Sequence, residues 1–592
     1  MQPTETTDLI SVRAPARMRT SAPVSVRLDQ WLRSERLSGW LLAIALALSA
    51  PSLGYGMQAD DHLLLLNART GAAPWALYSA EPADLVRARN LGALGWWSST
   101  DLSIGFLRPL ASLTHFVEFI AWPQAAWAMH LSNLVLYAVL LLIATKLYRQ
   151  LLPDPGSAGL AALMFAIDAG HAQSVGWISG RNTVLVAIFV LAAVLEYISA
   201  RRAQVPRFGG RSVVYFGLAL LCGESGISTL AYLLAYGLVM ETGPLRARLA
   251  PLWPHAAVAL VWAISYGLLH CGTHGMTLYR GLDSPLQILG QGLLDLPLWL
   301  FSLFGLSVVS LCLVLPVSLM RSLAVVLALP VLALLWPVLR HSRLGRFLML
   351  AMLLSIAPLL ATMPQDRLLI AASFGASGVI ACFFEFARSR SGTRERWGRC
   401  CFATLHLALA PLLFLQGLNG AGLIEKGVRI VLAQLPDMAG KELVVVNSPS
   451  ELLNPYALSA AWNAGIALPA SLHQLYSGSR QPVVTRVDAR TLEMSVPGGW
   501  GGPPIEATVL HGGKGVPRAG AVIQVANMRV QVLSATTDGM PERVRFEFPN
   551  SLESPDRLWL SWRHGRLAGW APPVRGTSVA LEPVNPFTSF AF

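Results

Sequence analysis

An acidic pair followed by a histidine stands where the first long apolar run of the chain ends. Asp60, Asp61 and His62 come a few residues after the apolar stretch 39–53. If that stretch spans a bilayer, all three lie close to its surface. Adjacent carboxylates raise one another's pKa and attract divalent cations, which suits a general base, a metal ligand or both. The alternative is a solvated helix exit, where aspartate is common and has no chemical role.

An arginine further along the same segment could bind an anion. Arg108 precedes Pro109 in a stretch that leads to the next apolar run. A guanidinium offers paired N–H donors that match a phosphate group. An arginine near the membrane interface can equally extend its charged end to lipid headgroups. Both interpretations stay open on the sequence.

Two ionisable residues fall inside an apolar run rather than beside one. Asp168 and His171 lie in the run 158–176, at a spacing that predicts one shared helix face, and Arg181 opens the following run. Ionisable groups at membrane depth are costly unless they face a cavity or each other, so they indicate a site. A structural Asp–His pair that joins two helices is the alternative.

The remaining candidates lie between later apolar runs. Glu224 occupies a tight turn between the runs 212–223 and 227–240. Asp366 and Arg367 separate the runs 347–361 and 368–386. Singly, each is weak evidence for a site.

The composition shows what must position these residues. Of the 592 residues, 54% are hydrophobic and only 13% are charged, and the mean hydropathy is +0.51. Such a chain must be dissolved mainly in a bilayer. The net charge of +12 comes from arginines in short hydrophilic segments between apolar runs, which is the positive-inside pattern and not a nucleic-acid surface. The six cysteines indicate neither a zinc site nor a disulfide scaffold.

We therefore predict a polytopic α-helical membrane protein with about eleven transmembrane helices. Residues 1–37 form a cytoplasmic tail, and 38–54 an uncleaved first helix, although a cleaved signal peptide is an alternative. The predicted crossings are 38–54, 126–148, 158–176, 181–200, 212–223, 227–240, 254–270, 315–339, 347–361, 368–386 and 400–418. With this topology the inner loops carry almost only arginine, whereas the outer loops mix Asp, Glu, His and Arg. The chemistry is expected on the outer face.

Three segments do not fit simple crossings. Residues 55–125 form a long first outer loop within the transmembrane domain 38–420. Residues 284–320 are interpreted as an interfacial or re-entrant segment, which requires a cavity to satisfy its backbone. After a linker at 421–440, short β-type runs at 443–446, 483–487, 521–532 and 543–548 predict a β-rich extracytoplasmic domain over 441–592.

Over roughly residues 38–400 the sequence resembles the GT-C glycosyltransferases, in particular bacterial relatives of the protein O-mannosyltransferases that carry tetratricopeptide repeats. The best part is 165–202, with Phe165-Ala-Ile, His171, Val175 and Trp177-Ile-Ser-Gly-Arg181. Arg108-Pro-Leu, 130–133, Glu224-Ser-Gly-Ile and Asp366-Arg367 follow in matching order. The usual His-Pro-x-His followed by Glu is here Asp168-Ala-Gly-His171 followed by Gln173, and the usual Lys before Glu224 is Gly223. The helical-repeat tail is replaced by the β-rich domain.

The resemblance implies transfer of a sugar from a polyprenyl-phosphate donor to a hydroxyl acceptor at the outer face of the bacterial cytoplasmic membrane. It implies a catalytic role for Asp60 or Asp61 and carrier-phosphate binding by Arg108, Arg181 and Arg367. His171, Glu224 and Asp366 are the other residues expected in the substrate-binding site. No cofactor is assigned, and a divalent cation held by Asp61 and His62 stays open. The alternatives are a non-enzymatic envelope scaffold that binds glycan and a transporter of lipid-linked sugar.

Overall fold

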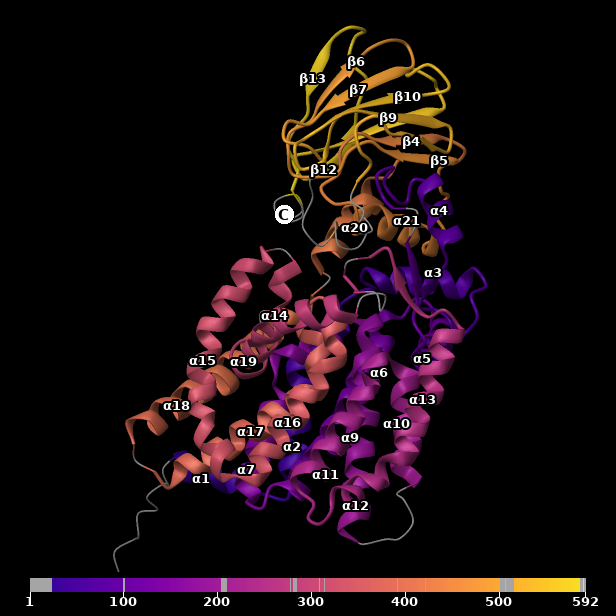
Figure 1. Cartoon of the computed structure of the whole chain (residues 1–592). Helices are drawn as coiled ribbons and strands as arrows, with labels where there is room; N and C mark the ends of the chain where they lie inside the picture. The colour runs from indigo at the N-terminus through magenta and orange to yellow at the C-terminus, as the bar shows by residue number, and fades with distance from the viewer. Residues whose placement is uncertain are drawn as a thin grey trace, which may run out of the picture.

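The molecule has a helical bundle at one end and a β-rich domain at the other, with a thin layer of short helices between them (Figure 1). The computed structural model describes residues 24–99, 102–203, 210–276, 278–280, 285–307, 309–313, 315–390, 392–420, 422–500, 506, 516–585 and 589. Most of the predicted cytoplasmic tail, residues 1–23, lies outside the described residues.

Within the described residues, nine stretches of helix are long and apolar enough to cross a membrane. They are Leu37–Gly54, Ala126–Leu151, Ile178–Arg202, Leu245–Leu268, Leu286–Phe304, Val317–His341, Arg343–Ala361, Asp366–Arg388 and Thr393–Gln434. Pro109–Ala121, Pro155–Ala166 and Gly210–Cys222 are shorter apolar helices. The predicted class, a polytopic helical membrane protein with a β-rich C-terminal region, is confirmed.

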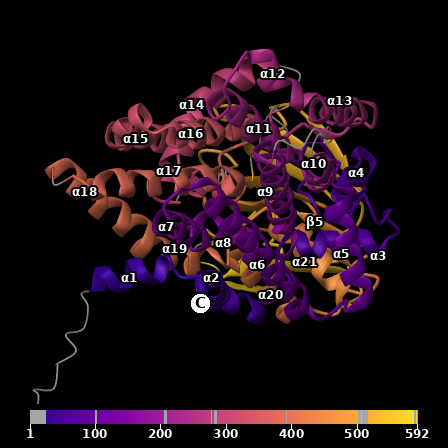
Figure 2. The ribbon, with the colours of Figure 1, turned by 90° about the horizontal axis from the view of Figure 1, so that it is seen from below.

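The bundle is built from helices that pack around α9. Its first half consists of α1 (Val24–Leu32), α2 (Leu37–Ser49), α5 (Pro109–Ala121), α6 (Ala126–Leu151), α7 (Pro155–Ala166), α8 (Ala172–Gly176), α9 (Arg181–Arg202), α10 (Gly210–Cys222) and α11 (Ser228–Val239). Its second half consists of α12 (Leu245–Leu249), α13 (Trp253–Leu268), α14 (Pro285–Phe304), α15 (Val317–His341), α16 (Arg343–Ile356), α17 (Ile370–Arg388), α18 (Thr393–Ala403) and α19 (Ala410–Gly417). From below, α9 and α11 lie in the middle of this arrangement while α15 and α18 project from one side (Figure 2).

The segment 284–320, predicted to be interfacial or re-entrant, is mostly helical. Residues Pro285–Phe304 form one 20-residue helix, α14, which packs beside α15. Pro297 lies inside α14, and Pro330 and Pro337 lie inside α15. Neighbouring helices can satisfy the backbone groups that such prolines release, so the helices continue through them.

The long first outer loop is folded rather than extended. It holds α3 (Asp60–Arg69), α4 (Pro82–Asn90) and the strands β1 (Ser79–Ala80) and β2 (Ser103–Gly105). β2 pairs with β1 and with β3 (Gly272–His274), both antiparallel. The loop is thereby tied to the connection that follows α13.

The C-terminal region contains two sheets and two helices. α20 (Gly422–Gln434) replaces much of the predicted linker, and α21 (Leu453–Asn463) connects two parallel strands. The antiparallel sheet has the order β13 (Ser578–Ala580), β6 (Val483–Arg486), β7 (Thr491–Ser495), β10 (Pro541–Glu547), β9 (Met528–Ala535) and β8 (Val522–Val525). The mixed sheet has the order β12 (Arg566–Gly569), β11 (Arg557–Arg563), β4 (Glu442–Val445) and β5 (Ser471–Gln474).

Two tryptophans of the outer loop are part of the core of this C-terminal region. Trp96 and Trp97 are 2% and 1% exposed and cluster with Val444, Trp500 and Phe546. The Trp96 indole also donates a hydrogen bond to the carbonyl of Leu475, 3.1 Å away. The outer loop and the β-rich region therefore share one core, which fixes how α21 lies against α3.

Candidate functional site

Asp60 is the first residue of α3, at the interface between the bundle and the C-terminal region. The preceding Ala59 has φ of 47°, a strained conformation for a residue with a side chain. This turn places the Asp60 carboxylate at a helix N-terminus, where negative charge is favoured. The Tyr456 hydroxyl of α21 donates a hydrogen bond to Oδ1 of Asp60 at 2.8 Å.

The electrostatic setting of Asp60 suits a base. Burial raises the pKa of Asp60, while the Tyr456 hydrogen bond and the positive charge of Arg367 act in the opposite direction. Asp60 as a whole residue nevertheless remains partly exposed. A carboxylate with a raised pKa accepts a proton more readily near neutral pH.

Asp61 has different partners from Asp60 and is fully buried. Its two oxygens accept hydrogen bonds from the backbone N–H groups of Gln58 at 2.8 Å and Ser179 at 2.7 Å. Burial raises the pKa of Asp61 to about 7, against these hydrogen bonds. The Trp177 indole adds a hydrogen bond to the Gln58 carbonyl at 3.0 Å. Asp61 thus joins the start of α3 to the residues just before α9.

The neighbours Asp366 and Arg367 also have different surroundings. The Arg367 guanidinium lies 5.0 Å from the centre of the Trp177 ring, and its charge acts on Asp60 and Tyr456. Asp366 instead accepts hydrogen bonds from the Ser302 hydroxyl and from the backbone N–H of Ser310 at 2.8 Å. Of the two, Arg367 belongs to the surroundings of Asp60, whereas Asp366 anchors the end of α14.

Arg108 and Glu224 form an ion pair close to the same region. Nε and Nη2 of Arg108 donate to one Glu224 oxygen at 3.0 and 2.8 Å. Tyr78 lies beside Arg108, and the charges of Asp60 and Asp61 also act on it. The predicted turn at Glu224 is confirmed as a short 3-10 helix. A Cβ at Gly223 would lie 3.1 Å from a Val186 methyl group, so a larger residue there needs the Val186 side chain to move slightly.

Arg181 is directed into the bundle and not toward Asp60. Its side chain is 1% exposed, and it forms a 2.7 Å ion pair with Glu118 of α5. It also donates to the Asn133 side chain at 2.6 Å and to the Met129 carbonyl at 3.0 Å. These contacts tie α9 to α5 and α6.

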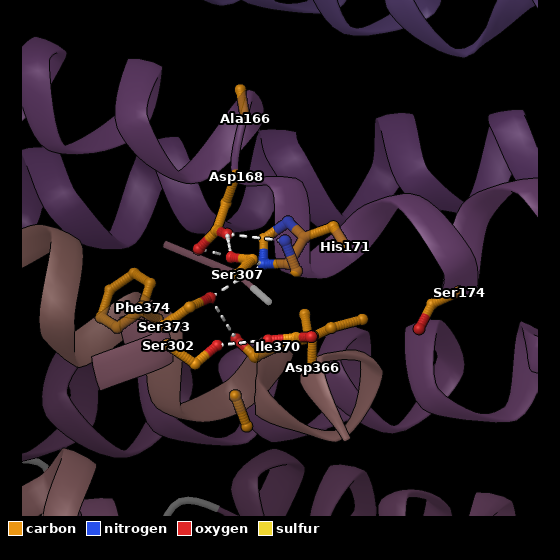
Figure 3. Close-up of polar contacts among 12 residues, drawn as sticks. Ala166, Asp168, His171, Ser174, Ser302, Ser307, Asp366, Ile370, Ser373 and Phe374 are labelled. Carbon is orange, nitrogen blue, oxygen red and sulfur yellow. Dashed lines mark hydrogen bonds and ion pairs between the residues drawn. The ribbon is translucent and has the colours of Figure 1, made fainter. Parts of the chain in front are cut away.

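Asp168 and His171 belong to a separate buried cluster (Figure 3). The expected shared helix face was wrong, because α7 ends at Ala166 and a 3-10 turn holds the pair. His171 contacts the Tyr137 hydroxyl at 3.1 Å and the Ser373 hydroxyl at 2.8 Å, and its Nε2 is 4.0 Å from Asp168. Asp168 lines a small cavity together with Ser307 and His406. The cluster joins α6, α7 and α17.

The residues proposed for a divalent cation do not fit one. Among the described residues, no group of three or more His, Cys, Asp or Glu side chains is placed to hold a metal ion. Asp61 directs both oxygens at backbone donors, and Nε2 of His62 contacts Glu425 of α20 at 3.0 Å. The carboxylate and the imidazole are therefore committed to different partners.

The fold and this site define a class: a polytopic helical membrane protein in which an acid of the long first loop lies near a tyrosine of the β-rich C-terminal region and an arginine of the bundle. No family model matches the chain. It is similar to the mouse protein O-mannosyl-transferase TMTC3, with 30% identity over 145 residues, 23% of this chain and 15% of the relative. It is similar to Drosophila melanogaster Tmtc1, named a protein O-mannosyl-transferase, with 28% identity over 196 residues, 32% of this chain and 21% of the relative. The predicted resemblance to protein O-mannosyltransferases is confirmed over these segments, and the chain spans about a fifth or less of the relatives it matches.

Two solved structures align with the chain at low identity. The archaeal oligosaccharyltransferase AglB from Archaeoglobus fulgidus, solved with an inhibitory peptide and a dolichol-phosphate, aligns with a TM-score of 0.39 and 11% identity over 74% of this chain and 65% of that chain. ArnT from Cupriavidus metallidurans in the apo state aligns with a TM-score of 0.36 and 12% identity over 73% of this chain and 89% of that chain.

Sequence reasoning missed the partner of Asp60. Tyr456 lies 396 positions further along the chain, in a segment that the patterns assigned to a separate domain. Glu118 was also missed, because residues 109–121 were taken as loop although they form the apolar helix α5. Its signal was available: a lone acid within the apolar sequence Phe-Val-Glu-Phe-Ile needs a cationic partner.

Proposed function

We propose that the chain is a membrane glycosyltransferase that moves a sugar from a polyprenyl-phosphate-linked donor to a hydroxyl acceptor at the outer face of the cytoplasmic membrane. The local sequence similarity to protein O-mannosyltransferases supports this class of reaction. The observation that carries the proposal is the Asp60 carboxylate, with its raised pKa, at a partly exposed residue near the charge of Arg367.

In the proposed reaction Asp60 is the general base. Its carboxylate accepts the proton of the acceptor hydroxyl as the oxygen attacks the anomeric carbon, and the bond to the carrier phosphate breaks with inversion. A raised pKa brings the base closer to neutral pH and strengthens its attraction for that proton. Asp61 does not share this role, because both of its oxygens already accept backbone hydrogen bonds.

The departing phosphate needs positive charge in a site that excludes water. Arg367 is the leading candidate, because it acts on Asp60 electrostatically and lies against Trp177. Arg108 is the second, although Glu224 balances part of its charge. Arg181 is assigned a structural role instead, since its guanidinium is buried against Glu118.

The test is sugar transfer from polyprenyl-phosphate sugars in membranes that contain the wild-type chain or its variants. Asp60→Asn is expected to abolish transfer while leaving the amount of folded protein unchanged. Asp538→Asn, in an exposed turn of the C-terminal region, is the matched control and should transfer at the wild-type rate. Full transfer by Asp60→Asn would refute the role of Asp60. Counterflow of a lipid-linked sugar without covalent transfer would instead identify a transporter.

A further inference from the structure

The contact between α21 and α3 is held at both ends of α21. At one end the Tyr456 hydroxyl donates to Asp60 at 2.8 Å. At the other, the Asn463 side chain donates to the His62 carbonyl at 2.9 Å, and Arg69 donates to the Asn463 carbonyl at 2.8 Å. Tyr456 and Asn463 are seven residues apart, which places them on one helix face two turns from each other. The register of α21 on α3 is therefore fixed.

Further contacts hold the layer beneath the sheets in place. His62 contacts Glu425 of α20 at 3.0 Å, with 12% and 7% of the two side chains exposed. The Gln58 side chain donates to Asn419 at 2.9 Å. Together with the buried Trp96, these contacts leave α21 little freedom to move away from α3. The contact between Tyr456 and Asp60 is therefore fixed by the packing of α21 on α3.

We propose that Tyr456 is a positioning residue for Asp60, by which the C-terminal region sets the orientation of the catalytic carboxylate. This inference rests on the proposed function. The hydroxyl donates to Oδ1, and the hydrogen bond holds the carboxylate so that Oδ2 is presented to the acceptor. Among the described residues, Tyr456 is the hydrogen-bond donor to the Asp60 side chain, and the charge of Arg367 also acts on that side chain.

The ionisation of the two groups agrees with these roles. Burial and the nearby carboxylate of Asp60 hold the pKa of Tyr456 well above its usual value, so the phenol stays protonated and can only donate to the anion. The same hydrogen bond lowers the pKa of Asp60 against the effect of burial. Loss of the hydroxyl must therefore raise the pKa of Asp60.

The test compares Tyr456→Phe with Tyr476→Phe in the full-length protein. Tyr476 is the matched control, because its hydroxyl contacts the Arg480 backbone and not Asp60. For Tyr456→Phe we expect kcat for transfer to fall about 10- to 100-fold, the loss typical of one hydrogen bond to a charged group. The KM for the donor should not change, and the acid limb of the pH–rate profile should move to higher pH. A profile that coincides with wild type would overturn the inference.

A second measurement does not depend on activity. Infrared difference titration follows the carboxyl band that disappears in Asp60→Asn. In Tyr456→Phe this band should titrate at higher pH than in the wild type, and in Tyr476→Phe at the wild-type pH. An unchanged titration in Tyr456→Phe overturns the positioning role whether or not the chain transfers sugar. Absence of transfer by the wild type, with the band shifted as expected, would refute the proposed function alone. Faster transfer by Tyr456→Phe would show that the hydroxyl blocks the acceptor position, and would also overturn the inference.

Discussion

The buried ion pair between Arg181 and Glu118 tests whether Arg181 has a structural role or binds phosphate. Arg181 is 1% and Glu118 9% exposed at the side chain, and their charged atoms are 2.7 Å apart. Removing one partner of a buried pair costs about 3–5 kcal/mol, because the other charge stays buried without compensation. Arg181→Met also leaves the Asn133 and Met129 oxygens without their donor. We expect each of Arg181→Met and Glu118→Gln to lower the free energy of unfolding by about that amount.

The double variant decides between a structural tie and a phosphate ligand. If the two side chains stabilise the fold through each other, Arg181→Met/Glu118→Gln should lose no more than the larger single change, with an interaction energy of about 3 kcal/mol in a double-mutant cycle. The assay is chemical unfolding of the purified protein in mixed micelles, alongside the KM for the polyprenyl-phosphate donor. Stabilities within about 0.5 kcal/mol of wild type, combined with a raised donor KM in Arg181→Met, would refute this reasoning and restore Arg181 as a phosphate ligand.

Four further predictions concern other contacts. Asp61→Asn should destabilise the protein by about 1–3 kcal/mol, because an amide can accept only one of the two backbone hydrogen bonds, as unfolding measurements would show. Because folding raises the Asp61 pKa to about 7, the folded state binds this proton more tightly, so wild-type stability should fall as pH rises from about 4 to 7 and the Asn variant should lose that slope. Arg108→Lys keeps the positive charge but loses the paired N–H donors, which contact Glu224 and match a phosphate group. The KM for the donor should therefore rise. An unchanged donor KM would contradict phosphate binding by Arg108. Trp96→Ala should cost about 3–5 kcal/mol and release the C-terminal region to limited proteolysis.

Composition and apolar periodicity were sufficient for the class of fold. Runs of apolar residues predicted the spans now seen as α6, α9, α15 and α17, and short runs of β-type residues predicted the strands β4, β6 and β10. Both signals are local, since a helix must match the bilayer thickness and a strand must alternate its two faces. The same signals did not predict α14, which is one 20-residue helix with Pro297 inside it.

The candidate site was predictable as a set of residue types but not as a geometry. The sequence identified Asp60 and Arg367, and the structure places them within electrostatic reach of each other. It grouped Arg181, His171 and Asp366 with them, although these side chains have structural partners in Glu118, Tyr137 and Ser310. Spacing along the chain gives the relative directions of side chains within one helix. It does not show which neighbouring helix each side chain contacts. Tyr456 could not be found at all, because its contact with Asp60 depends on how a distant domain docks.

The adjacency of Asp60 and Asp61 shows why two identical neighbours can have different roles. Successive residues of an α-helix point about 100° apart, so the first turn of α3 cannot direct both carboxylates at one substrate. One direction meets backbone N–H groups at the base of the loop, which makes Asp61 an anchor. The other meets α21, which leaves Asp60 partly exposed beside a hydroxyl that belongs to the C-terminal region. The bundle alone would therefore hold the acid without its partner, and the β-rich region is a component of the site rather than an appendage to it.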